Sequence, residues 1–136
     1  MKRIFKLLIA VLTAILLLPL SANADVNDFS FESFDAQYDI SLNEELDNRP
    51  EMIVTETLVA LFPDFNQNRG IRRDIPASSY GELPGLVKVI SVTDEAGNPR
   101  EYEETRDGNL VSLAIKASDG SFVLGRQTYV IKYSQA

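Results

Sequence analysis

The sequence contains no cysteine, no histidine and no tryptophan among its 136 residues. Without cysteine it has no disulfide, no thiolate nucleophile, no cysteine metal site and no thiol after the leader to carry a lipid. Without histidine it lacks the commonest metal ligand and the side chain that most often acts as a general base near neutral pH. We therefore expect a protein that is not an enzyme, with no catalytic residues, no metal site and no cofactor.

Residues 1–24 have the pattern of a cleavable export signal. Lys2, Arg3 and Lys6 supply positive charge, and an apolar run over residues 7–18 follows, interrupted only by a threonine. Residues 22–24 have the sequence Ala-Asn-Ala, the small-x-small pattern that signal peptidases cleave. The apolar run is shorter than the roughly 20 residues that a membrane-spanning helix needs. The sequence therefore predicts export out of the cytoplasm and cleavage after residue 24.

The domain predicted to remain, residues 25–136, is strongly acidic. Three of the 13 basic residues and none of the 20 acidic residues precede residue 25, which leaves 10 positive and 20 negative charges, a net charge of −10. Its 112 residues suffice for one domain. Because phosphate backbones and anionic lipids repel such a domain, we expect no nucleic-acid partner.

Alternating apolar residues separated by turn residues predict strands over most of residues 25–136. Ala36, Tyr38, Ile40 and Leu42 alternate on one face, as in a half-buried strand, whereas Glu56 falls in phase with apolar residues and has no partner identifiable from sequence. Asp-Gly pairs at 107–108 and 119–120 are strong hairpin signals. The expected fold is all-β: a two-sheet Ig-like β-sandwich with a C-terminal β-meander, preceded by a cleavable signal helix. The expected strands are residues 35–43, 52–62, 71–75, 86–93, 100–105, 110–117 and 122–133.

The candidate binding residues are Arg69, Arg72, Arg73 and Asp74. Three of the ten basic residues of the acidic domain fall within the five positions 69–73. In a strand Arg72 and Arg73 point to opposite faces, so they cannot form one patch by themselves. One interpretation is that one arginine pairs with a carboxylate while the other is solvated. The other interpretation is a contact with an anion or an acidic partner.

Three weaker patterns have plainer alternatives. Residues 64–70 begin like a calcium loop but lack its glycine and its bidentate glutamate, so we expect an Asx-rich turn. Glu101, Glu103, Glu104 and Asp107 could supply a carboxylate pair that hydrolyses glycosides, but we expect them to lie on a solvated edge strand. Tyr80 and Tyr102 could stack on sugar rings if they are exposed.

Several segments resemble the bacterial domain-of-unknown-function family 2207, a family of predicted membrane proteins. The segments that carry the resemblance are residues 29–38, 54–58, 62–63, 68–76 and 125–133, and the run ending Arg-Asp-Ile-Pro is the most specific. The resemblance implies a signal peptide, then this extracytoplasmic β domain, then transmembrane helices. No hydrophobic segment follows Tyr133 in the 136 residues. We therefore expect either a lone exported domain or the first part of a longer, membrane-anchored protein.

Together these observations predict a non-catalytic binding or structural module of a membrane-associated bacterial envelope protein. The expected partner is an unknown envelope protein or polymer, and the expected contact includes Arg69, Arg72, Arg73 and Asp74. The competing function classes are a carboxylate-based hydrolase and a carbohydrate-binding module, which would need a row of exposed aromatic side chains.

Overall fold

The computed structural model describes residues 25–77, 86–117 and 119–136. The export signal predicted for residues 1–24 and its helix lie outside the described residues, as does Tyr80. None of the helices in the described part of the chain is long and apolar enough to cross a membrane. The elements are β1 (Ser30–Asn43), the 3₁₀ turn η1 (Glu44–Leu46), β2 (Arg49–Phe62), β3 (Gly70–Pro76), β4 (Val87–Thr93), β5 (Glu101–Asp107), β6 (Leu110–Lys116) and β7 (Gly125–Gln135).

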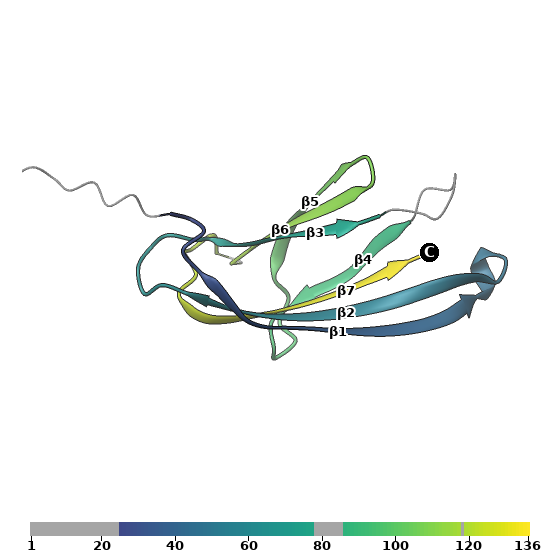
Figure 1. Cartoon of the computed structure of the whole chain (residues 1–136), viewed down its shortest axis with the longest axis horizontal. Helices are drawn as coiled ribbons and strands as arrows, with labels where there is room; N and C mark the ends of the chain where they lie inside the picture. The colour runs from purple at the N-terminus through teal and green to yellow at the C-terminus, as the bar shows by residue number, and fades with distance from the viewer. Residues whose placement is uncertain (1–24, 78–85, 118) are drawn as a thin grey trace, which may run out of the picture.

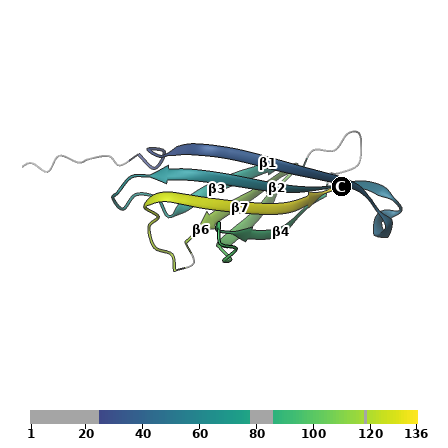
Figure 2. The same ribbon diagram turned by 90° about the horizontal axis from the view of Figure 1, so that it is seen from below.

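Two antiparallel sheets face each other, which confirms the predicted all-β sandwich. Sheet A has the order β1-β2-β7-β4 and sheet B has the order β3-β6-β5. In Figure 1 sheet A forms the lower layer and sheet B the upper layer, and Figure 2 shows the strand order of sheet A from below. Each predicted strand corresponds to an observed strand, because period-2 alternation and turn residues report local backbone geometry.

The predicted C-terminal meander is wrong in its connections. Of the four strands of the predicted meander, only β5 and β6 are consecutive and paired, through the turn at Gly108, where φ is +55°. β4 pairs with β7 and β6 pairs with β3, so the chain changes sheet between β4 and β5 and again between β6 and β7. The division into four and three strands is that of an immunoglobulin constant-type sandwich, with β5 and β7 exchanged between the sheets. Turn residues reverse the chain, but they do not decide whether the next strand pairs with the last or crosses to the other sheet.

Apolar side chains from both sheets fill the space between the layers. The most enclosed of them include Val54 on β2, Leu113 and Ile115 on β6, and Tyr129 and Ile131 on β7, all 1% exposed or less. These residues belong to one buried cluster. β2, β6 and β7 therefore provide the centre of the core, because β2 and β7 are the two inner strands of sheet A and β6 is the middle strand of sheet B.

The β1–β2 hairpin is longer than the sheet that faces it. β1 and β2 have 14 residues each, whereas β3, β5 and β6 have seven each. At about 3.3 Å per residue the hairpin spans about 46 Å and the facing strands span about 23 Å. Figure 1 shows the hairpin continuing to the right beyond sheet B. Part of the inner face of sheet A is therefore not covered by sheet B.

Candidate binding surface

The segment of candidate residues 69–74 leads into and forms most of β3. β3 is an outer strand of sheet B, and Ile71 and Ile75 point into the core from it. Since strand side chains alternate, Arg73 shares their inner face and Arg72 lies on the outer face. The Arg72 side chain is 66% exposed and the Arg73 side chain is 25% exposed. The structure thus separates the two neighbouring arginines, as the strand period predicts.

Arg73 forms a buried ion pair with Glu56 across the two sheets. Its Nε and Nη2 atoms donate to the two carboxylate oxygens of Glu56 at 2.7 and 2.6 Å. The hydroxyl of Tyr133 donates to the same carboxylate at 3.0 Å. Glu56 is 1% exposed, so this network provides the partners that a buried carboxylate needs. The glutamate without an identifiable partner in the sequence is therefore matched by an arginine 17 residues later.

The pKa values of Arg73 and Tyr133 are both shifted in the direction that keeps this hydrogen-bonded ion pair intact. The hydrogen bond with Glu56 raises the pKa of Arg73 against the opposing effect of burial. Burial, together with the neighbouring Glu56 carboxylate, raises the pKa of Tyr133, which keeps its hydroxyl protonated and available as a donor. Arg73 consequently holds sheet B against sheet A, and its guanidinium is already occupied by a bidentate carboxylate.

The other three candidate residues have partners of their own. Arg72 pairs with Asp74 at 2.8 Å and donates to the Ser112 hydroxyl at 3.0 Å on the outer face of sheet B. Hydrogen bonding from Ser112 and then the Arg72 guanidinium hold the pKa of Asp74 below its usual value. Arg69 stacks on Phe122 with its guanidinium carbon 4.2 Å from the ring centroid. The four residues thus lie in three separate environments, and their role in binding stays a prediction.

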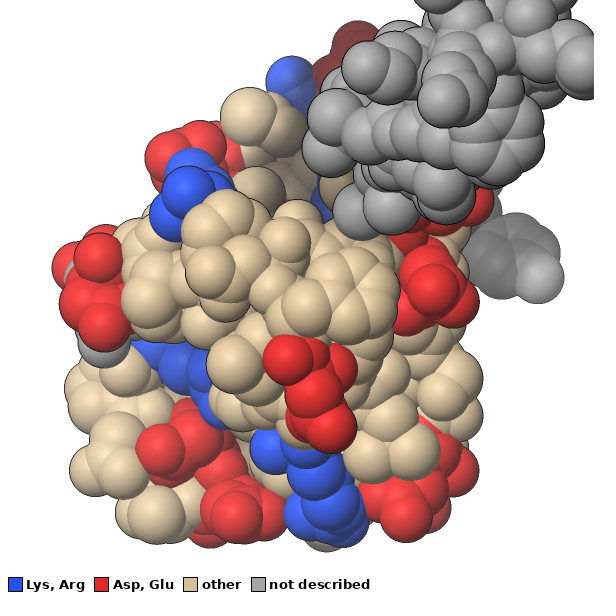
Figure 3. Space-filling view, turned by 90° about the vertical axis from the view of Figure 1, so that its left-hand side faces the viewer, with Lys and Arg blue, Asp and Glu red and all other residues tan. Residues whose placement is uncertain are grey.

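Two further basic side chains also lie beside acidic ones. Arg126 is 2.8 Å from Glu32 and 3.6 Å from Glu95, and Lys116 is 2.6 Å from Glu103. On the end of the domain shown in Figure 3, lysine and arginine side chains lie next to acidic side chains rather than gathering into one basic patch. The charges of this surface are therefore interspersed.

The acidic strand β5 is exposed along its whole length. Two of its carboxylates are in surface ion pairs: Glu103 with Lys116, and Glu104 with Arg106, both at 2.6 Å. In the described part of the chain no group of three or more acidic, histidine or cysteine side chains could hold a metal ion. Asp64, the first residue of the calcium-like pattern, lies exposed in the turn after β2.

A shallow cleft of about 490 Å³ lies where the β1–β2 hairpin meets the start of β4. Its polar lining includes Asn43, Glu51, Lys88 and Arg106. Asn43 donates to Glu51 at 2.6 Å, and Arg106 donates to the Val87 carbonyl at 2.7 Å. Much of the polar lining is thus engaged within the protein itself.

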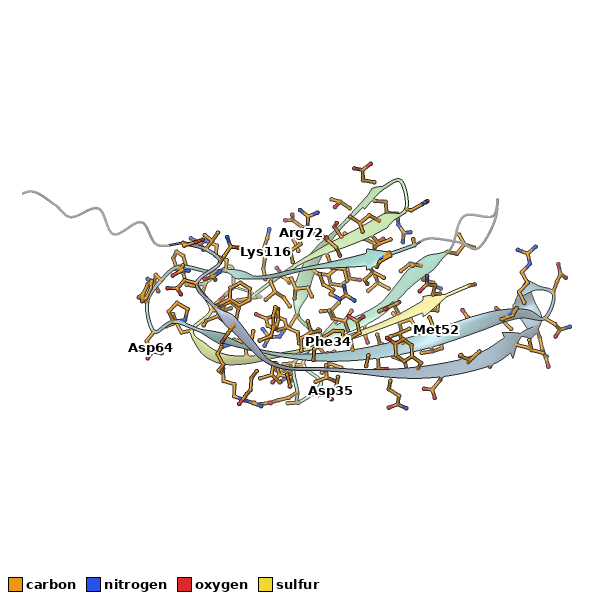
Figure 4. All side chains as sticks on the ribbon, viewed as in Figure 1. Phe34, Asp35, Met52, Asp64, Arg72 and Lys116 are labelled. Atoms are coloured by element: carbon orange, nitrogen blue, oxygen red, sulfur yellow. The ribbon has the colours of Figure 1, made fainter. Side chains whose placement is uncertain are left out.

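The most unusual surface of the domain is the inner face of β1. Phe34 is 52% exposed, Tyr38 57%, Ile40 73% and Leu42 65%, although all four point to the side of sheet A that faces sheet B. Figure 4 shows Phe34 and Met52 on this inner side and Asp35 on the opposite side of the sheet. Single exposed apolar residues are normal on a protein surface, whereas four large ones on one face form an apolar patch. We call these four residues the β1 apolar row.

The β1 apolar row corrects the prediction of a half-buried strand. Tyr38, Ile40 and Leu42 do share one face, as their alternation predicts, but the face is not covered. β1 is the edge strand of sheet A, and sheet B is too short to extend over its far half. Phe34 lies at the covered end, where the Arg73 guanidinium carbon is 5.7 Å from its ring centroid.

Sequence reasoning missed this surface because alternation gives the face of a strand and not its burial. A usable signal was present in the strand lengths. The predicted strands 35–43 and 52–62 are longer than the predicted strands 71–75 and 100–105 of the facing sheet. A long hairpin over a short sheet leaves apolar side chains uncovered at one end.

A scan against protein-family models, a search of curated proteins and a search of solved structures each found no match to this chain.

Proposed function

We propose that this chain is an exported, non-catalytic β-sandwich module of the bacterial envelope that binds a partner along strand β1. The observation that supports this binding most directly is the β1 apolar row, which lies exposed on an edge strand of 14 residues. Export and envelope association come from the leader pattern of residues 1–24 and from the family resemblance. The membrane attachment implied by that resemblance is part of the same proposal.

The edge of β1 supports strand addition as the mode of binding. β1 pairs with β2 on one side, and no other described strand pairs with its second side. Its outward backbone N–H and C=O groups can therefore accept an extended segment, which is how exposed sheet edges recruit peptides. The apolar row next to this edge would supply the side-chain contacts that give such an interaction its specificity.

A labelled peptide tests this mode of binding directly. The probe is an eleven-residue peptide in which valine and threonine alternate, and binding is measured by fluorescence anisotropy against the purified protein. We expect saturable binding that weakens at least about tenfold in Ile40→Lys, because an ammonium group then lies within the apolar row. The matched control is Ile90→Lys, since Ile90 is 48% exposed on β4 at the opposite edge of the same sheet. Equal loss in both variants, or no binding to the unmodified protein, would refute the proposal.

The export half of the proposal has its own measurement. When the full chain is expressed in a bacterium, we expect it outside the cytoplasm with Asp25 as its first residue, as read by N-terminal sequencing. A retained leader with all protein in the cytoplasmic fraction would overturn it.

Carbohydrate binding is the second candidate, because Phe31, Phe34 and Tyr38 are aromatic, about half exposed or more, and lie on the same face of β1. Exposed rings in a row can stack on sugar rings. Retention on cell-wall polysaccharide that is lost in Tyr38→Ala, without any binding of the alternating peptide, would favour this candidate over strand addition.

A further inference from the structure

We propose that the occupant of β1 is a second copy of this chain, whose own β1 adds antiparallel with Tyr38 of one copy opposite Tyr38 of the other. The inference rests on the proposed function, since it identifies the partner of the same edge. The result would be one continuous eight-stranded sheet made from two copies of sheet A.

β1 differs from the other three sheet edges in its lack of protection. β5 is short and carries charges at most of its positions, which is a common protection of edge strands. β3 has seven residues and ends in Pro76, and β4 is interrupted by a bulge between Val89 and Ser91. Residues 33–43 of β1 contain no lysine, arginine, proline or glycine. Apart from the bulge near Phe31 and two aspartates, β1, the fourth and longest edge, lacks these protective features.

Symmetry limits how two copies of β1 can pair. Directly opposed residues of an antiparallel pair point to the same face of the sheet. Two identical strands related by a two-fold axis normal to the sheet therefore pair with one residue opposite itself. With Tyr38 at that position, all eleven residues from 33 to 43 are paired, between the bulge near Phe31 and the end of β1.

The charges of β1 favour this register. Its outer face between residues 33 and 43 carries two acidic side chains, Asp35 and Asp39. With Tyr38 at the axis, Asp39 lies opposite Gln37, whose amide can donate to it, and Asp35 lies opposite Ser41. Moving the axis to residue 37 sets Asp35 against Asp39, and moving it to residue 39 sets Asp39 against itself. Directly opposed like charges are destabilising. Axes at residues 36 and 40 avoid like charges but pair only seven residues.

The same register matches apolar side chains on the inner face. Phe34 lies opposite Leu42, Ala36 opposite Ile40, and Tyr38 opposite its own copy. Each polar residue therefore meets a polar one and each apolar residue meets an apolar one, with a full set of new backbone hydrogen bonds. Strict alternation over residues 33–43 gives this match in every symmetric register, so the charges of the outer face and the number of paired residues select the register with Tyr38 at the axis.

The high negative charge of each copy opposes association at long range. Two domains of net charge −10 repel one another, and salt screens this repulsion. The dimer is therefore expected to strengthen as ionic strength rises, the reverse of an interface built on opposite charges. Sedimentation velocity at several protein and salt concentrations measures this dependence.

Single cysteines identify the register, because the chain has no cysteine of its own. Opposed residues have Cα atoms about 4.5–5.5 Å apart, within disulfide range, whereas diagonal neighbours are about 7–8 Å apart. Under mild oxidation of the purified protein we expect a covalent dimer for Tyr38→Cys and little or none for Gln37→Cys and Asp39→Cys. Lys88→Cys on β4 is the control for random collision, since Lys88 is exposed on the opposite edge.

Introducing a charge at Tyr38, the residue on the two-fold axis, gives an independent test of the register. Tyr38→Lys and Tyr38→Glu each set like charges opposite one another, so each alone is expected to weaken dimerisation at least about tenfold. An equimolar mixture of the two variants is expected to recover it, because lysine then lies opposite glutamate. Circular dichroism of each variant checks that the fold is kept, as expected for a side chain that is 57% exposed.

Three outcomes would overturn the inference: a monomer at every protein and salt concentration, equal cross-linking at positions 37, 38 and 39, or no recovery in the mixture. Failure here is separable from failure of the proposed function. If the alternating peptide binds β1 while the chain stays monomeric, strand addition is supported, and the proposal that a second copy of the chain is the partner is wrong. If neither associates with β1, both proposals are wrong.

Discussion

Replacing Arg73 with methionine is expected to lower the free energy of unfolding by about 3–5 kcal/mol. The substitution removes both guanidinium hydrogen bonds to Glu56 and leaves a carboxylate that is 1% exposed. Only the Tyr133 hydroxyl would still donate to it. An unpaired buried charge costs far more than the lost pair was worth, because the low-dielectric interior replaces water around it. Chemical denaturation of the variant and the unmodified protein measures the difference.

Two further variants separate the ion pair from a general effect of losing an arginine. Arg72→Met is the matched control, since Arg72 neighbours Arg73 on β3 but its ion pair is exposed to solvent. A change of about 0.5 kcal/mol or less is expected there. The double variant Arg73→Met with Glu56→Leu is expected to recover most of the lost stability, because both buried charges are then absent. Equal losses for Arg72→Met and Arg73→Met would contradict the assigned role of Arg73.

Gly70→Ala is expected to destabilise the domain by at least about 3 kcal/mol. Gly70 has a φ of +152°, in a region that side-chain-bearing residues rarely adopt. A Cβ atom built there would lie 1.8 Å from the carbonyl oxygen of Ile115. That oxygen belongs to the backbone of β6, so relief requires β3 to move away from its partner strand. Thermal and denaturant unfolding of the variant provide the measurement.

Gly108→Ala is the matched control for this prediction. Gly108 has a φ of +55° in the β5–β6 hairpin, and a Cβ atom there would meet nothing within 4 Å. Its substitution carries only the left-handed backbone cost, about 1–2 kcal/mol. A Gly70→Ala loss no larger than that of Gly108→Ala would show that the close approach to Ile115 has no consequence.

The two stability predictions also bear on the segment 69–74, which the sequence marks as unusual. Gly70 allows β3 to begin against β6, and Arg73 fixes β3 to sheet A through Glu56. Its unusual composition thus has a structural account at two positions. Arg69 and Arg72 are the exposed members of the candidate set, and Asp74, which pairs with Arg72 on the outer face, is partly exposed.

The sequence by itself determined the local structure of this protein. Alternation with period two located the seven strands, and the Asp107-Gly108 pair identified the one hairpin that joins β5 to β6. The same alternation placed Arg72 and Arg73 on opposite faces and Tyr38, Ile40 and Leu42 on one face. Each of these features depends on backbone geometry over a few neighbouring residues, which the sequence pattern reports directly.

Only the tertiary structure decided which strands pair, which arginine is internal and which apolar face stays open. β4 pairs with β7 rather than β5, and Glu56 meets Arg73 from the other sheet. Tyr38, Ile40 and Leu42 of the β1 apolar row are exposed because seven-residue strands face a 14-residue hairpin. These outcomes depend on how two layers of unequal length stack across the core. An alternating pattern predicts which face of a strand a side chain lies on, but not whether another layer covers that face.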